Sequence, residues 1–298
     1  MCEEIKKPDH ILHITLADSM VRGLLVTASE TVQEAQRIHS TSPVATAALG
    51  RTLMGTAMLS SMLKEDKASV TVTVDGGGPL GRLVCVGDSE SVRGSIENPK
   101  LELPLRVDGK LSVGAAIGTN GRMSVVKDLG LKSPYIGQVA LQSGEIAEDF
   151  AHYFLTSEQS PSLVSLGVLV AKEVVLAAGG ILLQPLPGCP DHIIDQLELR
   201  SPLFGEISRE LAHDSMETLM ASWFHGLHPI VLKSTPLAYR CQCSRQRMEK
   251  ALIALGREEL TKMIEDEIDG AELCCHFCKA SHHFSTHDLI RLLNKAVQ

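Results

Sequence analysis

Five of the chain's eight cysteines lie between residues 241 and 278, and four of them form two close pairs. Cys241 and Cys243 are separated by one residue, and Cys275 and Cys278 by two. Thiolate sulfur is a preferred ligand of zinc, and two close cysteine pairs on separate loops are typical of tetrahedral four-cysteine sites. The spacing therefore predicts one zinc ion held by these four thiolates.

A second ligand set uses the later cysteine pair together with two histidines. Cys275, Cys278, His283 and His287 have a spacing that suits a compact Cys2His2 site. This set ranks second because it leaves the first cysteine pair without a role. Buried free thiols are a third explanation, since cysteine is often a small core residue. Five cysteines in so short and polar a segment make that explanation the weakest.

The same spacing also suits redox chemistry. Zinc-bound thiolates can remain nucleophilic, and the members of each pair are close enough in sequence to form a disulfide when the metal leaves. A disulfide between Cys241 and Cys243 would close a small, strained ring, and strained disulfides are readily reduced. Loss of a structural zinc removes on the order of 10 kcal/mol of folding free energy. These points favour a redox switch over a static zinc ribbon, which remains the alternative.

Composition excludes several classes of partner. The 298 residues carry 28 Lys and Arg against 36 Asp and Glu, no segment concentrates basic side chains, and only 3% of residues are aromatic. Nucleic acid and anionic membrane are therefore not expected as partners. Two long apolar stretches, residues 43–63 and 163–186, contain charged residues and are expected to be core elements. The first residues do not resemble a secretory signal, so we expect a cytoplasmic protein.

The first part of the chain mixes strand and helix patterns. Strands are predicted over residues 11–26 and 69–74, and helices over 31–39 and 43–64. Thr31 and Glu34 fit a capping box for the first helix, and Ser42 followed by Pro43 fits the start of the second. This pattern predicts an α+β fold class, with a mixed α/β domain in which helices pack a sheet.

A glycine-rich segment at residues 76–81 formally matches the dinucleotide-binding pattern G-x-G-x-x-G. The flanking residues 70–74 and 83–86 are β-branched or apolar, and Pro79 disfavours a helix, so a hairpin turn is the better interpretation. Common hydrolase, zinc-protease and phosphate-loop motifs are missing from the sequence. We therefore assign no catalytic residue and do not expect an enzyme.

Three regions follow from the distribution of prolines and from the helical pattern. A proline-rich segment at residues 184–190 separates a first domain (1–185) from a helical linker (186–235), which precedes a small zinc domain (236–298). In the linker, residues 191–227 have a helical pattern with an apolar stripe. We call this set the linker stripe, and its default interpretation is a core-facing helix: Met216, Leu219, Met220, Trp223 and Leu227. In the last region, residues 245–254 and 258–266 and a segment from Asp288 are expected to be helical.

The cysteine pattern, together with other segments, resembles the thirty-three-kilodalton heat-shock chaperonin family, which consists of redox-regulated holdase chaperones. The resemblance extends over nearly the whole length, with family-like segments at residues 42–51, 126–130, 135–137, 144–149, 157–159, 161–162 and 179–188. It implies an N-terminal α+β domain, a helical linker and a C-terminal zinc domain, in a protein whose reduced, zinc-loaded form is inactive.

The resemblance also implies a mechanism and partners. Oxidants such as peroxide or hypochlorite, with mild unfolding, would form the disulfides Cys241–Cys243 and Cys275–Cys278. The released linker would expose apolar surface, the protein would dimerise, and unfolded clients would be held without ATP. The linker stripe is a hypothesis for part of that surface. Two residues depart from the family pattern, Cys274 and Cys189, and either of them makes the oxidised connectivity less certain than the zinc ligands.

The sequence therefore supports three functional hypotheses. The first is a redox-activated, ATP-independent holdase. The second is an enzyme of the α+β domain with a structural zinc, which would show a cleft containing acids or bases with perturbed pKa values. The third is a constitutive zinc-ribbon module that binds a protein or RNA partner, although the acidic charge balance fits RNA poorly.

Overall fold

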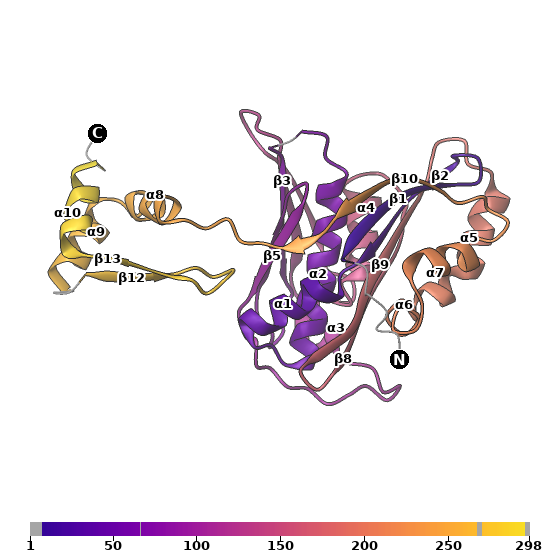
Figure 1. The fold of residues 1–298 in the computed structure, drawn as a ribbon, viewed down its shortest axis with the longest axis horizontal. Helices are drawn as coiled ribbons and strands as arrows, with labels where there is room; N and C mark the ends of the chain where they lie inside the picture. The colour runs from indigo at the N-terminus through magenta and orange to yellow at the C-terminus, as the bar shows by residue number, and fades with distance from the viewer. Residues whose placement is uncertain (1–7, 66, 267–269, 296–298) are drawn as a thin grey trace. The chain divides into compact units, whose positions relative to one another are not determined.

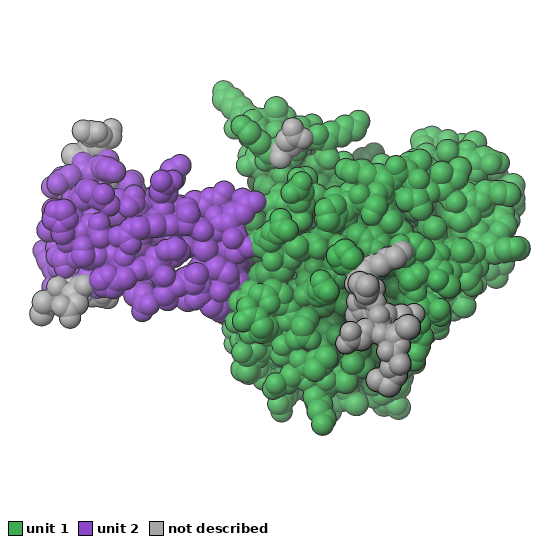
Figure 2. Space-filling view, in the orientation of Figure 1, with its two compact units in different colours: residues 1–240 green, residues 241–298 purple. Residues whose placement is uncertain are grey.

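The computed structural model describes residues 8–65, 67–266 and 270–295. The chain divides into two compact units, residues 1–240 and residues 241–298, drawn in green and purple in Figure 2. Each unit is described by itself below. Residues 1–7, on which the expectation about a secretory signal rests, lie outside the described residues.

Both units are built from helices and mainly antiparallel strands. The elements of the first unit are β1 (His10–Leu16), β2 (Val21–Thr27), α1 (Ser29–His39), α2 (Pro43–Ser61), β3 (Ser69–Asp75), β4 (Leu83–Gly87), β5 (Ser91–Ile96), α3 (Val113–Ile117), β6 (Arg122–Asp128), β7 (Tyr135–Ala140), α4 (Ala147–Thr156), β8 (Leu163–Ala171), β9 (Val174–Pro185), α5 (Asp191–Phe204), α6 (Ile207–Glu210), α7 (Met216–Trp223), β10 (Ile230–Pro236) and β11 (Ala238–Tyr239). Those of the second unit are α8 (Arg245–Leu255), α9 (Arg257–Asp266), β12 (Ala271–Cys274), β13 (Ser281–Phe284) and α10 (Thr286–Lys295).

The first unit has two sheets with a helix between them (Figure 1). The inner five-stranded sheet has the order β10-β1-β2-β9-β8, and the second sheet has the order β11-β5-β4-β3-β6-β7. All neighbouring strands pair antiparallel except β11 and β5, which pair parallel. The predicted α+β class is confirmed, although we expected one sheet and the structure has two.

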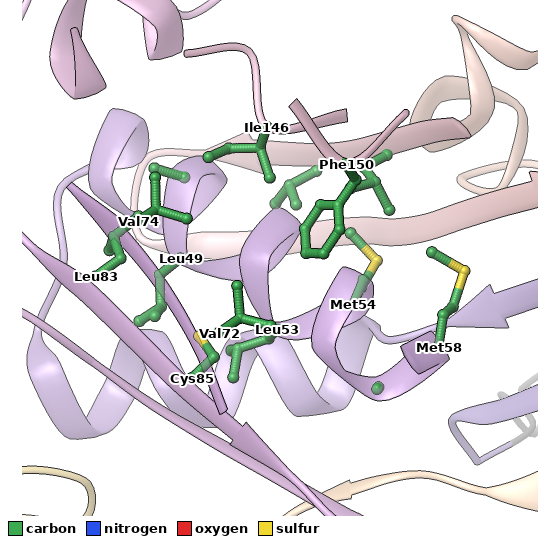
Figure 3. Close-up of a cluster of buried hydrophobic side chains, with 14 of the residues drawn as sticks. Leu49, Leu53, Met54, Met58, Val72, Val74, Leu83, Cys85, Ile146 and Phe150 are labelled. Atoms are coloured by element: carbon green, nitrogen blue, oxygen red, sulfur yellow. The ribbon is translucent and has the colours of Figure 1, made fainter. Parts of the chain in front are cut away.

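Helix α2 forms the centre of the first unit, and nearly all of its residues are buried. As predicted, Pro43 is its first residue, and the Ser42 side chain accepts a hydrogen bond from the Ala45 amide. Its buried side chains share one core with side chains of both sheets and α4. Figure 3 shows part of this core, in which Leu53 lies near Val72 of the second sheet and Met54 lies near Phe150 of α4. The predicted hairpin turn at residues 76–81 is also confirmed, because β3 and β4 pair directly across it.

The predicted capping box of α1 is wrong. The helix begins at Ser29, and no side chain caps it at Ala28. The carboxylate of Asp9 instead accepts a hydrogen bond of 2.6 Å from the Thr31 amide. A side chain distant in sequence therefore satisfies one of the free amide groups of the first turn.

The predicted strand over residues 11–26 is divided into two strands. Ala17, Asp18 and Ser19 all have positive φ angles, and this tight left-handed turn lets β2 return along β1. Consecutive residues of a strand point to opposite faces. In β1, Ile11 accordingly joins the core around α2, whereas Leu12 joins a separate cluster on the outer face.

Helices α5, α6 and α7 cover this outer face of the five-stranded sheet. Their buried side chains form one cluster with those of β1, β2 and β9, and Phe204 packs edge to face against Trp223 with ring centroids 5.6 Å apart. Of the linker stripe, Met216, Leu219, Trp223 and Leu227 are at most 5% exposed, and Met220 is partly buried against the same cluster. The linker stripe therefore faces the core between α5–α7 and the five-stranded sheet.

The last part of the predicted helical linker is a strand. Residues 230–236 form β10 and pair antiparallel with β1, consistent with the β-branched Ile230 and Val231 near its start. The amide of Leu237 then donates to the carbonyl of Asp9, and β11 pairs with β5. We call residues 230–240 the strap, because this one segment pairs with the edges of both sheets.

Residues 163–186, one of the two apolar stretches of the sequence, form the paired strands β8 and β9. Among the described residues, the structure contains no helix that is both long and apolar enough to cross a membrane.

Replacing Phe204 tests the packing of α5–α7 on the sheet. Phe204 is fully buried, so Phe204→Ala should lower the free energy of unfolding by about 3–5 kcal/mol through lost contacts and a cavity. Leu203→Ala is the control, because Leu203 is 50% exposed and its loss should change stability little. Urea unfolding can be followed by the fluorescence of Trp223, the single tryptophan. Equal effects of the two substitutions would contradict the packing described.

His13 makes the first unit sensitive to pH. It lies on β1 opposite Lys233 of β10, and burial, followed by the charge of Lys233, lowers its pKa. The unfolded chain therefore takes up the proton first as pH falls below about 6.5, so stability should decrease toward acid pH. We expect His13→Gln to show a smaller loss of unfolding free energy between about pH 7.5 and about pH 5.5. Parallel pH curves for the two proteins would rule this out.

Candidate metal centre

The second unit places both cysteine pairs in turns next to regular elements. Cys275 and Cys278 lie in the tight turn that joins β12 to β13, where the Cys275 amide donates to the Ala280 carbonyl at 2.9 Å. Cys241 and Cys243 precede α8, whose first turn is capped by the Ser244 side chain. The two pairs therefore belong to separate segments that the fold brings together.

The four thiols form a compact cluster. The sulfur atoms of Cys241, Cys243, Cys275 and Cys278 all lie within 4.8 Å of one another. The Sγ atoms of Cys241 and Cys275 are 3.7 Å apart, and those of Cys243 and Cys278 are 3.3 Å apart. Zinc–sulfur bonds of about 2.3 Å in a tetrahedron place sulfurs about 3.8 Å apart. The cluster therefore fits a metal ion that prefers four sulfur ligands.

Burial and mutual proximity perturb the thiols. Burial raises the pKa of Cys241 to about 11, and burial together with the neighbouring thiols raises the pKa of Cys243. Burial also acts against ionisation of Cys275, but hydrogen bonds from the backbone amides of Cys278 and Phe277 and from the thiols of Cys241 and Cys278 together lower the pKa of this thiol. Four thiolates at these distances would repel one another strongly, and a divalent cation among them removes that repulsion.

Cys274 lies beside the cluster without joining it. It is exposed, whereas Cys275 is 5% exposed, because consecutive residues at the end of β12 point in opposite directions. The Cys274 thiol contacts the carbonyl of Lys279 at 3.5 Å. Cys189, the other thiol outside the family pattern, packs at the edge of the cluster between the sheet and α5–α7 in the first unit.

The structure does not bring the histidines of the second ligand set into the cluster. Among the described residues, the group of possible metal ligands at this place consists of the four cysteines, without His283 or His287. His283 lies on β13 and is exposed. The geometry thus favours the four-cysteine set over the Cys2His2 set.

Residues on either side of the first cysteine pair make contacts that sequence reasoning did not anticipate. Tyr239 lies near the end of the strap, two residues before Cys241, and its hydroxyl donates to the Gly94 carbonyl at 2.8 Å. Arg245, two residues after Cys243, bonds the backbone of β13 and a carboxylate of α10. The sequence signal that could have pointed to these contacts is that an arginine and one of only three tyrosines lie beside the first cysteine pair.

Comparison with known proteins agrees with this geometry. The family described as "Hsp33 protein" matches residues 9–285. This chain belongs to the Hsp33 family. The "33 kDa chaperonin" of Alkaliphilus metalliredigens is 42% identical over 288 residues, covering 96% of this chain and 98% of the relative. That of Acetivibrio thermocellus is 43% identical, with coverages of 96% and 97%.

A solved Hsp33 structure has the same fold. The crystal structure of the 33 kDa chaperonin (heat shock protein 33 homolog) from Thermotoga maritima superposes with a TM-score of 0.89 at 36% sequence identity. The match covers 98% of this chain and 99% of that one. The family resemblance inferred from the cysteine pairs is therefore confirmed.

Substitution of single cysteines separates ligands from bystanders. Cys243→Ser should lower zinc affinity by more than about tenfold, because it removes one sulfur from the cluster. Cys274→Ser is the matched control and should retain zinc like the parent protein. Zinc retention can be measured by competition with a coloured chelator. If His283→Ala or His287→Ala released zinc and Cys243→Ser did not, the Cys2His2 set would hold instead.

Proposed function

We propose that this protein is a redox-regulated, ATP-independent holdase chaperone that protects unfolding proteins from aggregation under oxidative and heat stress. Membership of the Hsp33 family and the name of its relatives, 33 kDa chaperonin, support the chaperone assignment. The observation that carries the redox assignment is the cluster of four free thiols within 4.8 Å. Clustered cysteines that bind a metal or do redox chemistry are typical of the reducing cytoplasm, where we place the protein.

The resting state in this proposal is reduced, with zinc on Cys241, Cys243, Cys275 and Cys278. When bound, zinc would keep all four sulfurs deprotonated and cross-link the two segments that carry them. The second unit has a small core, whose buried side chains are Leu252, Leu260, Ala271, Phe284, Leu289 and Leu292. A unit of this size depends on such a cross-link for its stability.

Activation is the oxidation of the thiolates by peroxide. One thiolate attacks an oxygen of peroxide and becomes a sulfenic acid, and hydroxide leaves. The second thiolate of the pair then displaces the remaining oxygen as hydroxide and closes a disulfide. Each pair gives up two electrons, and one peroxide is reduced to two waters after uptake of two protons. The proposed products are Cys241–Cys243 and Cys275–Cys278, whose sulfurs no longer hold the metal.

Metal loss would affect the first unit through the covalent connection between the second unit and the strap. Cys241 follows the strap directly, and the strap is held by strand pairing to both sheet edges and by the Tyr239 hydroxyl. Unfolding of the second unit removes the folded segment to which the strap is joined. We therefore expect β10 and α5–α7 to loosen after oxidation, which makes residues 186–235 the redox-sensitive linker of this proposal.

The linker stripe is the proposed client-binding surface, together with the sheet face beneath it. In the reduced state Met216, Leu219 and Trp223 are buried against that sheet, so the surface is masked. Flexible methionine side chains can adapt to varied apolar segments of clients. Exposed apolar surface also favours self-association, and we propose a homodimer as the active form.

Simultaneous measurement of zinc, linker and chaperone activity tests this function. Peroxide at heat-shock temperature should release about one zinc per chain, shift the Trp223 emission to longer wavelength as α7 leaves the sheet, and suppress light scattering by a heat-denatured client. The three changes should occur together and reverse with a thiol reductant. Protein kept reduced at the same temperature is the control and should protect the client weakly.

Two results would contradict the proposal. If zinc were released while client aggregation continued unchanged, the metal would be structural and the function would lie elsewhere. If the reduced, zinc-loaded protein protected the client as well as the oxidised protein, the site would serve a constitutive binding module.

A further inference from the structure

Arg245 occupies an unusual place at the start of α8. It follows the N-cap residue Ser244 and stands two residues after Cys243. Its Nη1 donates to the backbone carbonyl of His283 at 2.5 Å, and its Nη2 donates to an Asp288 carboxylate oxygen at 2.8 Å. One side chain thus joins the segment carrying the first cysteine pair to both β13 and α10.

The Arg245 guanidinium also lies over an aromatic ring of the core. Its central carbon is 4.3 Å from the ring centroid of Phe284, and Phe284 is fully buried in the second unit. Stacking on an aromatic face and a planar fork of donors are features of arginine that lysine does not share. These contacts fix the plane of the guanidinium in addition to its position.

A ring of charges holds the partners of Arg245 in place. Arg291 of α10 donates to both Glu249 of α8, at 3.0 Å, and Asp288, at 3.2 Å. Asp288 also accepts hydrogen bonds from the amide and hydroxyl of Ser285. Arg245 and Glu249 on α8 therefore face Asp288 and Arg291 on α10 in an alternating arrangement.

The energy of this ring is modest, so its main consequence is geometric. The Arg245 side chain is 44% exposed, and ion pairs at such exposure contribute little to stability individually. A bidentate, stacked arginine nevertheless restricts the orientation of the segment to which it is attached. Here that segment includes Cys243, two residues before Arg245. The Sγ atom of Cys243 lies 3.3 Å from the Sγ atom of Cys278.

We propose that Arg245 is the positioning residue of the metal centre, and that it clamps the start of α8 to β13 and α10 so that the first cysteine pair faces the second. The inference rests on the proposed zinc function and adds a determinant of metal affinity outside the ligand set. Without the clamp, metal binding must itself order the Cys241–Cys243 segment, and that ordering lowers the affinity.

The test compares three full-length variants with the parent protein. Arg245→Ala removes the clamp, and Arg245→Lys keeps the charge without the fork. Arg257→Ala is the control, because Arg257 is exposed and is likewise the first residue of a helix in this unit. Zinc affinity is measured by chelator competition. Cobalt added to the metal-free protein reports the ligand geometry through its visible absorption bands.

Arg245→Ala should weaken zinc affinity by about 10–100-fold, as removal of residues that support ligands does, and should alter the cobalt bands. Arg245→Lys should fall between Arg245→Ala and the parent, and Arg257→Ala should match the parent. A merely stabilising role would leave the cobalt bands unchanged. If Arg245→Ala does not fold, Arg245→Lys decides the matter.

Three results would overturn the inference. Parent-like affinity and cobalt bands in Arg245→Ala would show that the fold positions the cysteines without the clamp. Full restoration by Arg245→Lys would show that charge alone acts on the centre. Equal loss in Arg257→Ala would indicate a general effect of positive charge. If the parent itself bound neither zinc nor cobalt, the proposed function would fail first.

Discussion

Burial of both faces of the five-stranded sheet is the constraint on which the first unit depends. Alternate residues of its central strands point to opposite sides, with Leu24 toward α2 and Leu25 toward α7. An apolar face left in water is unfavourable by roughly 25 cal/mol for each Å² exposed. One face is covered by a helix embedded in the core, whereas the other is covered by three short helices. The buried helix α2 shares its core with the second sheet, whereas the three helices on the other face pack in a separate cluster with the five-stranded sheet.

The second unit is under a different constraint, because it has few apolar side chains with which to build a core. Its buried cluster is small, and its helices carry many charged residues. Surface ion pairs such as those of Arg291 add little stability by themselves. A metal bound to four sulfurs would supply what the core lacks, and such a dependence would make the unit sensitive to oxidation. The same chemistry that stabilises it would then determine when it unfolds.

Local signals in the sequence succeeded where the structure uses local interactions. Ser42 and Pro43 start α2 as predicted, because a cap and its helix are neighbours in the chain. They failed where a distant residue took over the role, as Asp9 does for the first turn of α1. The strand β10 was missed because its pairing partner, β1, is more than two hundred residues away. The second sheet was missed for a similar reason, since alternation predicts strands without telling which strands pair.

In the metal centre too, the sequence predicts what depends on local spacing and misses what depends on contacts between distant residues. Spacing predicted the four cysteines that cluster, because two close cysteine pairs on separate segments are typical of four-sulfur metal sites. Spacing also left the histidine set open, and only the fold separates it from the cluster by directing His283 elsewhere. For Arg245 the only sequence signal is its position two residues after Cys243, because its contacts are with a carbonyl and a carboxylate about forty residues further along the chain. The cysteine cluster can thus be predicted from sequence, whereas its geometry depends on contacts between distant segments.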